Sequence, residues 1–338
     1  MTNDAPPPSG RLHYLGLLRF TGPDSLSFLQ GQVSNDTRRL ADGQGLLAAY
    51  SSPQGRVLAL MQLLPHSSGT IAILPRELVA PTLEALRRFV LRAKVKIEDA
   101  SDLLWVAGRH GGPHAGSQPQ SGSHAQSGYV ETDGVGTAPV NHDPGRYWVI
   151  GAEDLPSSPP AQASPPAQAS PPAQASPPTQ ASPPAHAVER AWRLADIRAG
   201  LPQIYLATRE TFVAQMLNLD LLDGISFSKG CYTGQEIIAR TQHLGRIKRR
   251  LYRLQLPRGE WTVGQVLRLT DGRSGRLTEV IETEQGFEAL AVLPLESATV
   301  ATVAAEAGAA VAAEASAERD AETGPAVAAA PLPLPYQL

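Results

Sequence analysis

The residues of this chain most suited to chemistry lie in the octet KGCYTGQE at positions 229–236, which holds the only cysteine among 338 residues. A thiol acts as a nucleophile or a metal ligand in its thiolate form, which nearby positive charge favours. Lys229 supplies such a charge two residues before Cys231. The pattern therefore predicts a reactive or ligand-contacting thiol. The alternative is a small buried cysteine with no chemical role, which is the commoner fate of a lone cysteine.

A helix is expected to begin inside the octet. Thr233 and Glu236 have the S/T-x-x-E spacing of a capping box, which predicts a helix from about Gly234 to Arg240. Cys231 would then lie just outside a helix N-terminus, where the positive end of the helix dipole also favours a thiolate. The glycines at 230 and 234 would let the backbone adopt positive φ or pass close to a ligand.

The elements that must position the octet alternate between strands and helices. Strand patterns occur at 11–20, 46–50, 56–64, 70–74, 94–98, 103–107 and 146–151, and helical patterns at 24–31, 76–90, 188–199 and 208–222. Trp192 and Ile197 are expected to be buried in the third of these helices. The segment 108–140 has little apolar content and is expected to be a long loop. Strands joined by hairpins and interspersed with helices indicate an α+β fold.

A polar tripeptide follows the first helical pattern. The side chains of Ser34, Asn35 and Asp36 can hydrogen-bond to neighbouring backbone groups, which predicts a tight turn.

Composition limits the classes of function. With 42% hydrophobic residues the chain can form real cores, and its formal charge of −3 gives no global attraction to nucleic acid. One cysteine excludes an internal disulfide framework and a cysteine-rich zinc or iron–sulfur site built by this chain alone, so no metal site is expected. The start of the chain has no signal-peptide pattern and no run of eighteen apolar residues follows, which favours a cytoplasmic protein without membrane contact.

Low-complexity segments divide the chain. Five copies of a hexapeptide close to SPPAQA, within 151–187, cannot form a core and predict an extended spacer inserted into one region formed by 11–150 and 188–244. Short strands with glycine-rich turns at 245–296 predict a small C-terminal β-barrel. Residues 1–10 and the alanine-rich acidic tail at 297–338 are expected to be disordered.

Together these segments resemble a known family. The runs DIRAGLP, MLNLDLLDGISFSKGCYTGQEIIART and GRIKRRL, with FLQGQVSNDT, PQGRVL and LRAKVKIED upstream, resemble the folate-binding YgfZ family within the superfamily of the glycine-cleavage T-protein. The resemblance covers most of residues 11–296, and the octet is its most specific part. It implies three lobes around a central cavity that binds tetrahydrofolate or a folate derivative.

The resemblance also implies a function and a set of site residues. The function is support of iron–sulfur cluster assembly or repair in client proteins, including tRNA-modifying enzymes, through transient contacts. Lys229 and Cys231 match the functional residues of the family, and Glu236 occupies the place of a carboxylate that would bind the donor edge of the pterin. The residues expected to contact the folate are Gly230, Tyr232, Gly234, Gln235, Glu236, Arg240, Asn35 and Asp36.

Two other functions remain open. A folate-dependent aminomethyl or methyl transferase is one, but the T-protein carries an acidic pair where this chain has Arg56, Val57, Leu58 and Ala59, so a classical aminomethyltransferase is not expected. The other is a tRNA-binding module. The segment 237–259 contains seven basic residues and no acidic one: Arg240, Arg246, Lys248, Arg249, Arg250, Arg253 and Arg258. In a strand, Arg246, Lys248 and Arg250 would share one face; an ordinary solvated face is the alternative.

Overall fold

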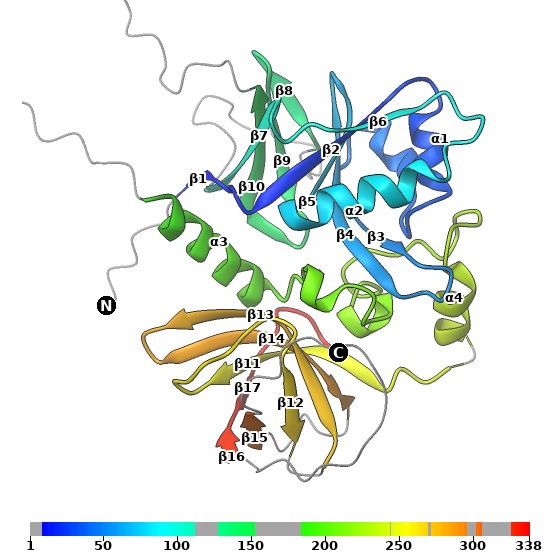
Figure 1. Ribbon diagram of the computed structural model, residues 1–338. Helices are drawn as coiled ribbons and strands as arrows, with labels where there is room; N and C mark the ends of the chain where they lie inside the picture. The colour runs from blue at the N-terminus through cyan, green and yellow to red at the C-terminus, as the bar shows by residue number, and fades with distance from the viewer. Residues whose placement is uncertain are drawn as a thin grey trace, which may run out of the picture.

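The computed structural model describes residues 9–111, 128–152, 184–243, 245–269, 272–295, 302–305 and 326–338. These residues form three antiparallel sheets with few helices (Figure 1). This mixed architecture agrees with the α+β class expected from the sequence. The predicted spacer at 151–187 falls outside the described residues except at its ends, where 151–152 finish a strand and 185–187 begin a helix, contrary to the prediction.

The first sheet carries the hairpin that faces the octet. Its strand order is β3-β4-β5-β2-β6, with bounds Leu46–Ser51, Val57–His66, Gly69–Pro75, Leu15–Thr21 and Lys96–Asp99. The first eight residues of β4 are all buried, because both faces of this strand are covered. Helix α2, Arg76–Arg87, follows β5, and the short helix α1, Ser25–Gln30, follows β2.

The second sheet corrects the prediction of a long loop at 108–140. Its order is β1-β7-β10-β9-β8, with bounds Gly10–Arg11, Leu104–His110, Asp143–Ala152, Val135–Val140 and Val130–Thr132. β9 alternates buried and half-buried residues, but its sequence VGTAPV is too small and too rich in Gly and Pro to give a strong strand signal. Residues 112–127 lie outside the described part of the chain.

One long helix joins the sheets. Helix α3, Ala185–Ala199, buries Trp192 and Ile197 as predicted, and it ends at Gly200, whose φ of 67° is the left-handed conformation that glycine adopts easily. The segment that follows has two 3₁₀ turns, η2 at Leu206–Thr208 and η3 at Ala214–Leu217, where a longer helix was expected. It leads through the octet into α4, Gln235–His243.

The third sheet includes part of the tail that we expected to be disordered. Its order is β16-β15-β12-β13-β14-β11-β17, with bounds Ala326–Ala328, Thr302–Ala305, Val266–Leu269, Ser274–Thr283, Gly286–Pro294, Arg249–Leu256 and Ala330–Leu332. The order of the described strands is that of an open sheet, so the small barrel remains a prediction.

The C-terminal residues are ordered because they have specific partners. β17 pairs with β11, and the hydroxyl of Tyr336 donates to the carbonyl of Gly200 at 2.8 Å. Leu334 and Tyr336 also pack against the main hydrophobic core. The disorder prediction is therefore wrong for 326–338. The prediction failed because it extended the alanine-rich composition of the preceding residues to the end of the sequence, although this last segment contains apolar residues, Leu334 and Tyr336, that pack against the core.

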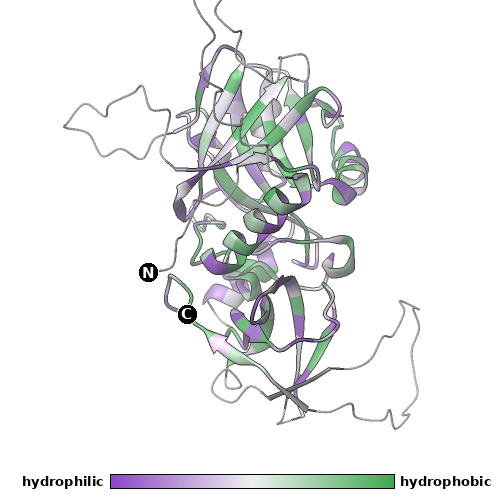
Figure 2. Ribbon diagram, turned by 90° about the vertical axis from the view of Figure 1, so that its left-hand side faces the viewer, coloured by the Kyte–Doolittle hydropathy of each residue, from purple (hydrophilic) through white to green (hydrophobic). Residues whose placement is uncertain are grey.

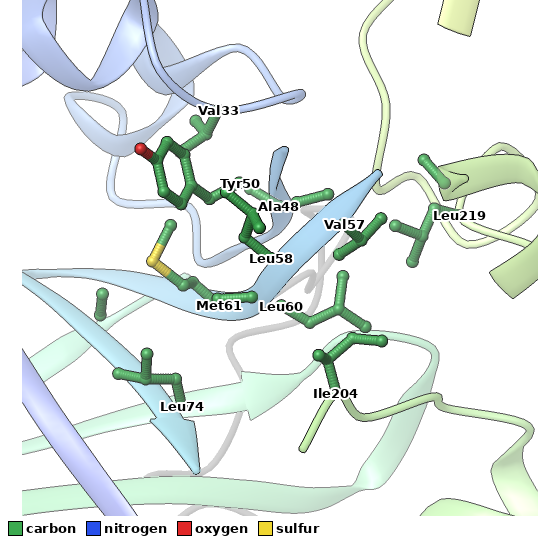
Figure 3. Packing of buried hydrophobic residues seen from close by; sticks show 14 of the residues in the cluster. Val33, Ala48, Tyr50, Val57, Leu58, Leu60, Met61, Leu74, Ile204 and Leu219 are labelled. Carbon is green, nitrogen blue, oxygen red and sulfur yellow. The ribbon is translucent and has the colours of Figure 1, made fainter. Parts of the chain in front are cut away.

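Buried side chains connect the sheets. The largest cluster combines β3, β4 and α2 with the segment from Ile204 to Ile238, and Figure 3 shows Val57 beside Leu219 and Leu60 beside Ile204. Figure 2 shows hydrophobic residues along much of the strands and hydrophilic residues on the exposed sides of helices. Among the described residues, no helix is both long enough and apolar enough to span a membrane.

Candidate functional site

The thiol of Cys231 is exposed on the loop that precedes α4. The helix begins at Gln235, close to the predicted start, but the described hydrogen bonds at its start differ from the predicted capping box. The Oε1 of Gln235 accepts from the N–H of Tyr232 at 3.3 Å. Glu236 is 81% exposed and pairs with Arg240 at 3.2 Å on the outer side of the helix. The structure thus places these two charged residues together, facing solvent.

Lys229 points inward, away from the exposed part of the loop. Its Nζ donates to the carbonyl oxygens of Gln30, Val33 and Asn35 at 2.8, 2.6 and 2.8 Å. It lies 4.9 Å from the ring centre of Tyr232, which is also buried. Burial lowers the pKa of Lys229 to about 8. The loop that carries Cys231 is thereby tied to the turn after α1.

The turn at 34–36 has the structural role that its polar residues predict. Asn35 is fully buried, and its Nδ2 donates to the carbonyls of Leu47 and Asp223 at 2.8 and 2.6 Å. Its Oδ1 accepts from the N–H of Asp36. Asn35 therefore joins two segments that are far apart in the sequence.

Asp36 and Ser34 complete this turn. The carboxylate of Asp36 caps η1, Thr37–Leu40, by accepting from the N–H and the side chain of Arg38, and these bonds hold its pKa well below the usual range. Ser34 donates to the carbonyl of Gly224 at 2.6 Å and accepts from the N–H of Ala49 at 2.8 Å. Ser34 therefore links the turn to β3 and to the segment that precedes the octet.

One glycine of the octet allows a close approach. Gly234 has φ of 82°, and a Cβ at this position would lie 2.6 Å from the carbonyl oxygen of Ser52 in the β3–β4 turn. Gly55 in that turn also has positive φ and packs against Ile237. By contrast, a Cβ at Gly230 would have no heavy atom within 4 Å. Gly234 therefore fits α4 against the hairpin, whereas Gly230 is open to solvent.

A small cavity with polar lining lies between the first two sheets and the end of α3. It has a volume of about 50 Å³, and its polar lining residues are Tyr14, Gln62, Asn141, Trp148, Asp196 and Gln203. The Nε1 of Trp148 is buried and has no hydrogen-bond partner among the described residues. None of the eight residues predicted to contact folate lines this cavity.

Asp196 is the carboxylate of this cavity. Burial raises the pKa of Asp196 to about 6, and the guanidinium of Arg146, 2.8 Å away, opposes that shift. Arg146 also pairs with Asp143 at 2.7 Å and lies 4.5 Å from the ring centre of Trp192. Sequence reasoning missed Asp196, although it lies in the quoted run DIRAGLP. An acidic residue among the apolar positions of a buried helix is the signal that could have found it.

A larger hollow lies on another part of the structure. It has a volume of about 350 Å³ and is lined by residues that include Arg11, His13, Arg76, Asp102 and Trp105. Arg76 pairs with Asp102 at 2.7 Å, and Arg11 stacks over Trp105 at 5.2 Å. None of these residues belongs to the predicted site.

The basic segment 237–259 does not place Arg246, Lys248 and Arg250 together on one face of a strand. β11 begins only at Arg249, so Arg246 and Lys248 precede the strand. Arg250 is buried and pairs with Asp220 at 2.6 Å, and Arg253 pairs with Glu288 at 2.6 Å. The positive charges of the basic segment are therefore divided between buried ion pairs and exposed side chains.

Bacterial relatives place this chain in a known family. The tRNA-modifying protein YgfZ of Hamiltonella defensa is 30% identical over 258 residues, which cover 76% of this chain and 70% of that protein. The tRNA-modifying protein YgfZ of Pectobacterium carotovorum is 31% identical over 275 residues, 78% of this chain and 75% of that protein. The chain belongs to the YgfZ family. No family model matches it.

The fold of this YgfZ-family member is also found in a solved structure. The glycine cleavage system aminomethyltransferase T from Bartonella henselae matches with a TM-score of 0.64 over 98% of this chain and 86% of that chain. Sequence identity is 12%, so the match concerns the fold. The resemblance to both the YgfZ family and the T-protein fold is thus confirmed. No group of three or more His, Cys, Asp or Glu residues in the described ranges could hold a metal ion.

Proposed function

We propose that this protein binds a tetrahydrofolate in the cytoplasm and supports iron–sulfur cluster assembly or repair in client enzymes, including tRNA-modifying ones. The observation that carries the proposal is a lone exposed thiol on a firmly tied loop, in a family whose relatives are named tRNA-modifying proteins. A thiol presented outward can contact another macromolecule. Binding of the folate would use the separate cavity between the sheets.

The chemistry of the cavity fits a pterin. The 2-amino group and ring N–H of a pterin form a donor edge that a carboxylate accepts, and Asp196 supplies that carboxylate. The unpartnered N–H of Trp148 and the amides of Gln62, Asn141 and Gln203 can bond the remaining polar atoms. Asp196 is therefore a better candidate for this role than Glu236, which faces solvent.

The cavity is smaller than a bound folate requires. Its volume of about 50 Å³ is below the roughly 300 Å³ at which ligand pockets begin. Folate binding therefore requires the walls to part. The segment at 201–203, which follows the end of α3 at Gly200, contributes one wall and lies outside regular secondary structure.

The thiol of Cys231 would act by transient contact. Stable iron–sulfur clusters are held by several ligands, usually four cysteines, and this chain has a single cysteine. Cys231 would therefore act as one ligand of a cluster whose other ligands belong to the client. The protein is then a binding and support factor, whose activity is read in its clients.

Two variants test the two halves of the proposal. Cys231→Ser should lower the activity of client iron–sulfur enzymes in cells that lack the natural protein, while folate binding by the pure protein stays unchanged. Asp196→Asn should weaken tetrahydrofolate binding in a fluorescence titration. Ser228→Ala, in the exposed loop that carries Cys231, is the control. Full client activity with Cys231→Ser would refute the thiol's role, and unchanged folate affinity with Asp196→Asn would refute the assigned cavity.

The structure gives less support to the alternatives. Arg56, at the place of the T-protein acidic pair, donates to the carbonyl of Thr211 at 2.8 Å and so joins the hairpin to the segment after η2. No carboxylate occurs at 56–59 to assist a transfer. Transfer of a one-carbon unit to or from tetrahydrofolate by the pure protein would revive the transferase. Salt-sensitive tRNA binding would support the tRNA-binding module.

A further inference from the structure

Lys229 makes an unusually complete set of contacts for a lysine. An ammonium group has three N–H donors and no acceptor. Here all three have carbonyl partners at hydrogen-bonding distance, namely those of Gln30, Val33 and Asn35. Lys229 is only 5% exposed. Every donor of this buried cation is thus used by the main chain.

The three carbonyls belong to one short stretch at the end of α1. The last carbonyls of a helix lack partners within the helix, and a cation placed there bonds them favourably. Gln30 is the last residue of α1, and Val33 and Asn35 lie in the turn that follows. The hydrogen bonds span 194 to 199 residues of sequence, so they fix the octet against a distant part of the fold.

Lys229 and Tyr232 flank the exposed residues Gly230 and Cys231 in the sequence. Both residues are buried and contact each other through the ammonium and the aromatic ring. Gly230 and Cys231, between them, are exposed. The chain therefore leaves the core at Lys229, presents two residues to solvent and returns at Tyr232. We call residues 230 and 231 the thiol arch.

We propose that Lys229 is a positioning residue, whose ammonium holds the thiol arch in one conformation by bonding the carbonyls of Gln30, Val33 and Asn35. This inference deepens the proposed function, because it concerns how the thiol is presented to a client. Since all three N–H groups are engaged, Lys229 holds the arch from inside and does not itself contact the client.

The protonation of Lys229 gives this device a measurable signature. Its pKa of about 8, lowered by burial, means that the third N–H is lost in mildly alkaline solution. The charged groups that act on it are Asp36, which raises the pKa, and Arg38, which lowers it. One of the three carbonyls should therefore lose its donor as the pH rises through about 8.

The single cysteine allows a direct test. A nitroxide attached to Cys231 through a thioether reports the mobility of the thiol arch by electron paramagnetic resonance, with no other labelled site. The full chain is compared as wild type, Lys229→Met, Lys229→Arg and the control Lys248→Met, which removes an exposed lysine. Thermal unfolding of each variant shows that measurements are made on folded protein.

We expect the label in Lys229→Met to move faster by roughly twofold or more, and the control to match the wild type. The label in Lys229→Arg should have an intermediate mobility, because a planar guanidinium presents its N–H donors in one plane and cannot bond three carbonyls in the way an ammonium does. In the wild type, label mobility should rise between about pH 7 and about pH 9.5, and it should stay flat in Lys229→Met.

Wild-type mobility in both Lys229 variants would overturn the proposal, as would an equal increase in Lys248→Met. If Lys229→Met does not fold, the test rests on Lys229→Arg and on the wild-type pH series. The proposal is then overturned if the label in Lys229→Arg has wild-type mobility and the mobility of the wild-type label does not change with pH. The measurement uses neither folate nor a client. Its failure is therefore distinguishable from failure of the proposed function, which is read in folate affinity and client activity.

Discussion

Arg250 and Asp220 form a bidentate ion pair, with nitrogen–oxygen distances of 2.6 and 2.8 Å. Their side chains are only 10% and 8% exposed. Arg250 also donates to the carbonyl of Gln215 at 3.1 Å. The start of β11 is thereby fixed to the segment that leads into the octet. Because its guanidinium is already bonded, Arg250 is unavailable to an external anion.

Removal of Arg250 should destabilise the fold. Arg250→Met leaves the carboxylate of Asp220 buried without its partner, so we expect a loss of about 3 kcal/mol in the free energy of unfolding. Arg246→Met, at an exposed position of the same basic segment, should change it by about 0.5 kcal/mol or less. Urea denaturation measures both. Equal losses in the two variants would show that the buried pair has no special role.

The two glycines of the octet should respond differently to alanine. Gly234→Ala requires a left-handed alanine and brings its Cβ to 2.6 Å from the carbonyl of Ser52, so we expect a loss of roughly 2 kcal/mol or more. Gly230→Ala has open space and should cost about 0.5 kcal/mol or less. Chemical denaturation of the two variants tests this contrast, and a larger loss with Gly230→Ala would contradict the described packing.

The C-terminal segment should contribute to stability through Tyr336. Its hydroxyl donates to the carbonyl of Gly200 and accepts from the Nδ2 of Asn218 at 3.3 Å, and burial raises its pKa to about 12. Tyr336→Phe removes only the hydroxyl, so we expect a loss of about 1 kcal/mol. Leu338→Ala, at an exposed position, is the control. A thermal unfolding midpoint unchanged by Tyr336→Phe would argue against this anchor.

Local patterns in the sequence predicted several parts of the fold. The helix after Cys231, the polar turn at 34–36 and the burial of Trp192 all follow from spacing over a few residues. Local patterns could not show that Lys229 bonds carbonyls more than 190 residues away. They also could not show that Arg250 turns inward, because the start of β11 decides which residues share a face.

The cavity was harder to predict than the thiol. Asp196, Trp148 and Gln62 come from three elements of the fold that only tertiary packing brings together. The family resemblance directed attention to Glu236, which is the last residue of the octet but lies on the exposed side of α4. A residue's place in a motif therefore does not determine which way its side chain faces, and the pairing of Asp196 with Arg146 arises only from tertiary packing.

Asp196 should give folate affinity and protein stability opposite pH dependences. Burial raises its pKa from 3.8 to about 6, so the folded protein holds this proton more tightly than the unfolded chain. Its contribution to stability is therefore present at low pH and is lost as the pH rises from about 4 to about 6. Binding of the donor edge of a pterin requires the ionised carboxylate, so tetrahydrofolate affinity should rise over the same range. Titrations and urea denaturation between about pH 4.5 and pH 7.5 measure the two quantities, and Asp196→Asn should flatten both profiles. If the variant keeps the wild-type pH dependence of folate affinity, Asp196 is not the group that binds the pterin.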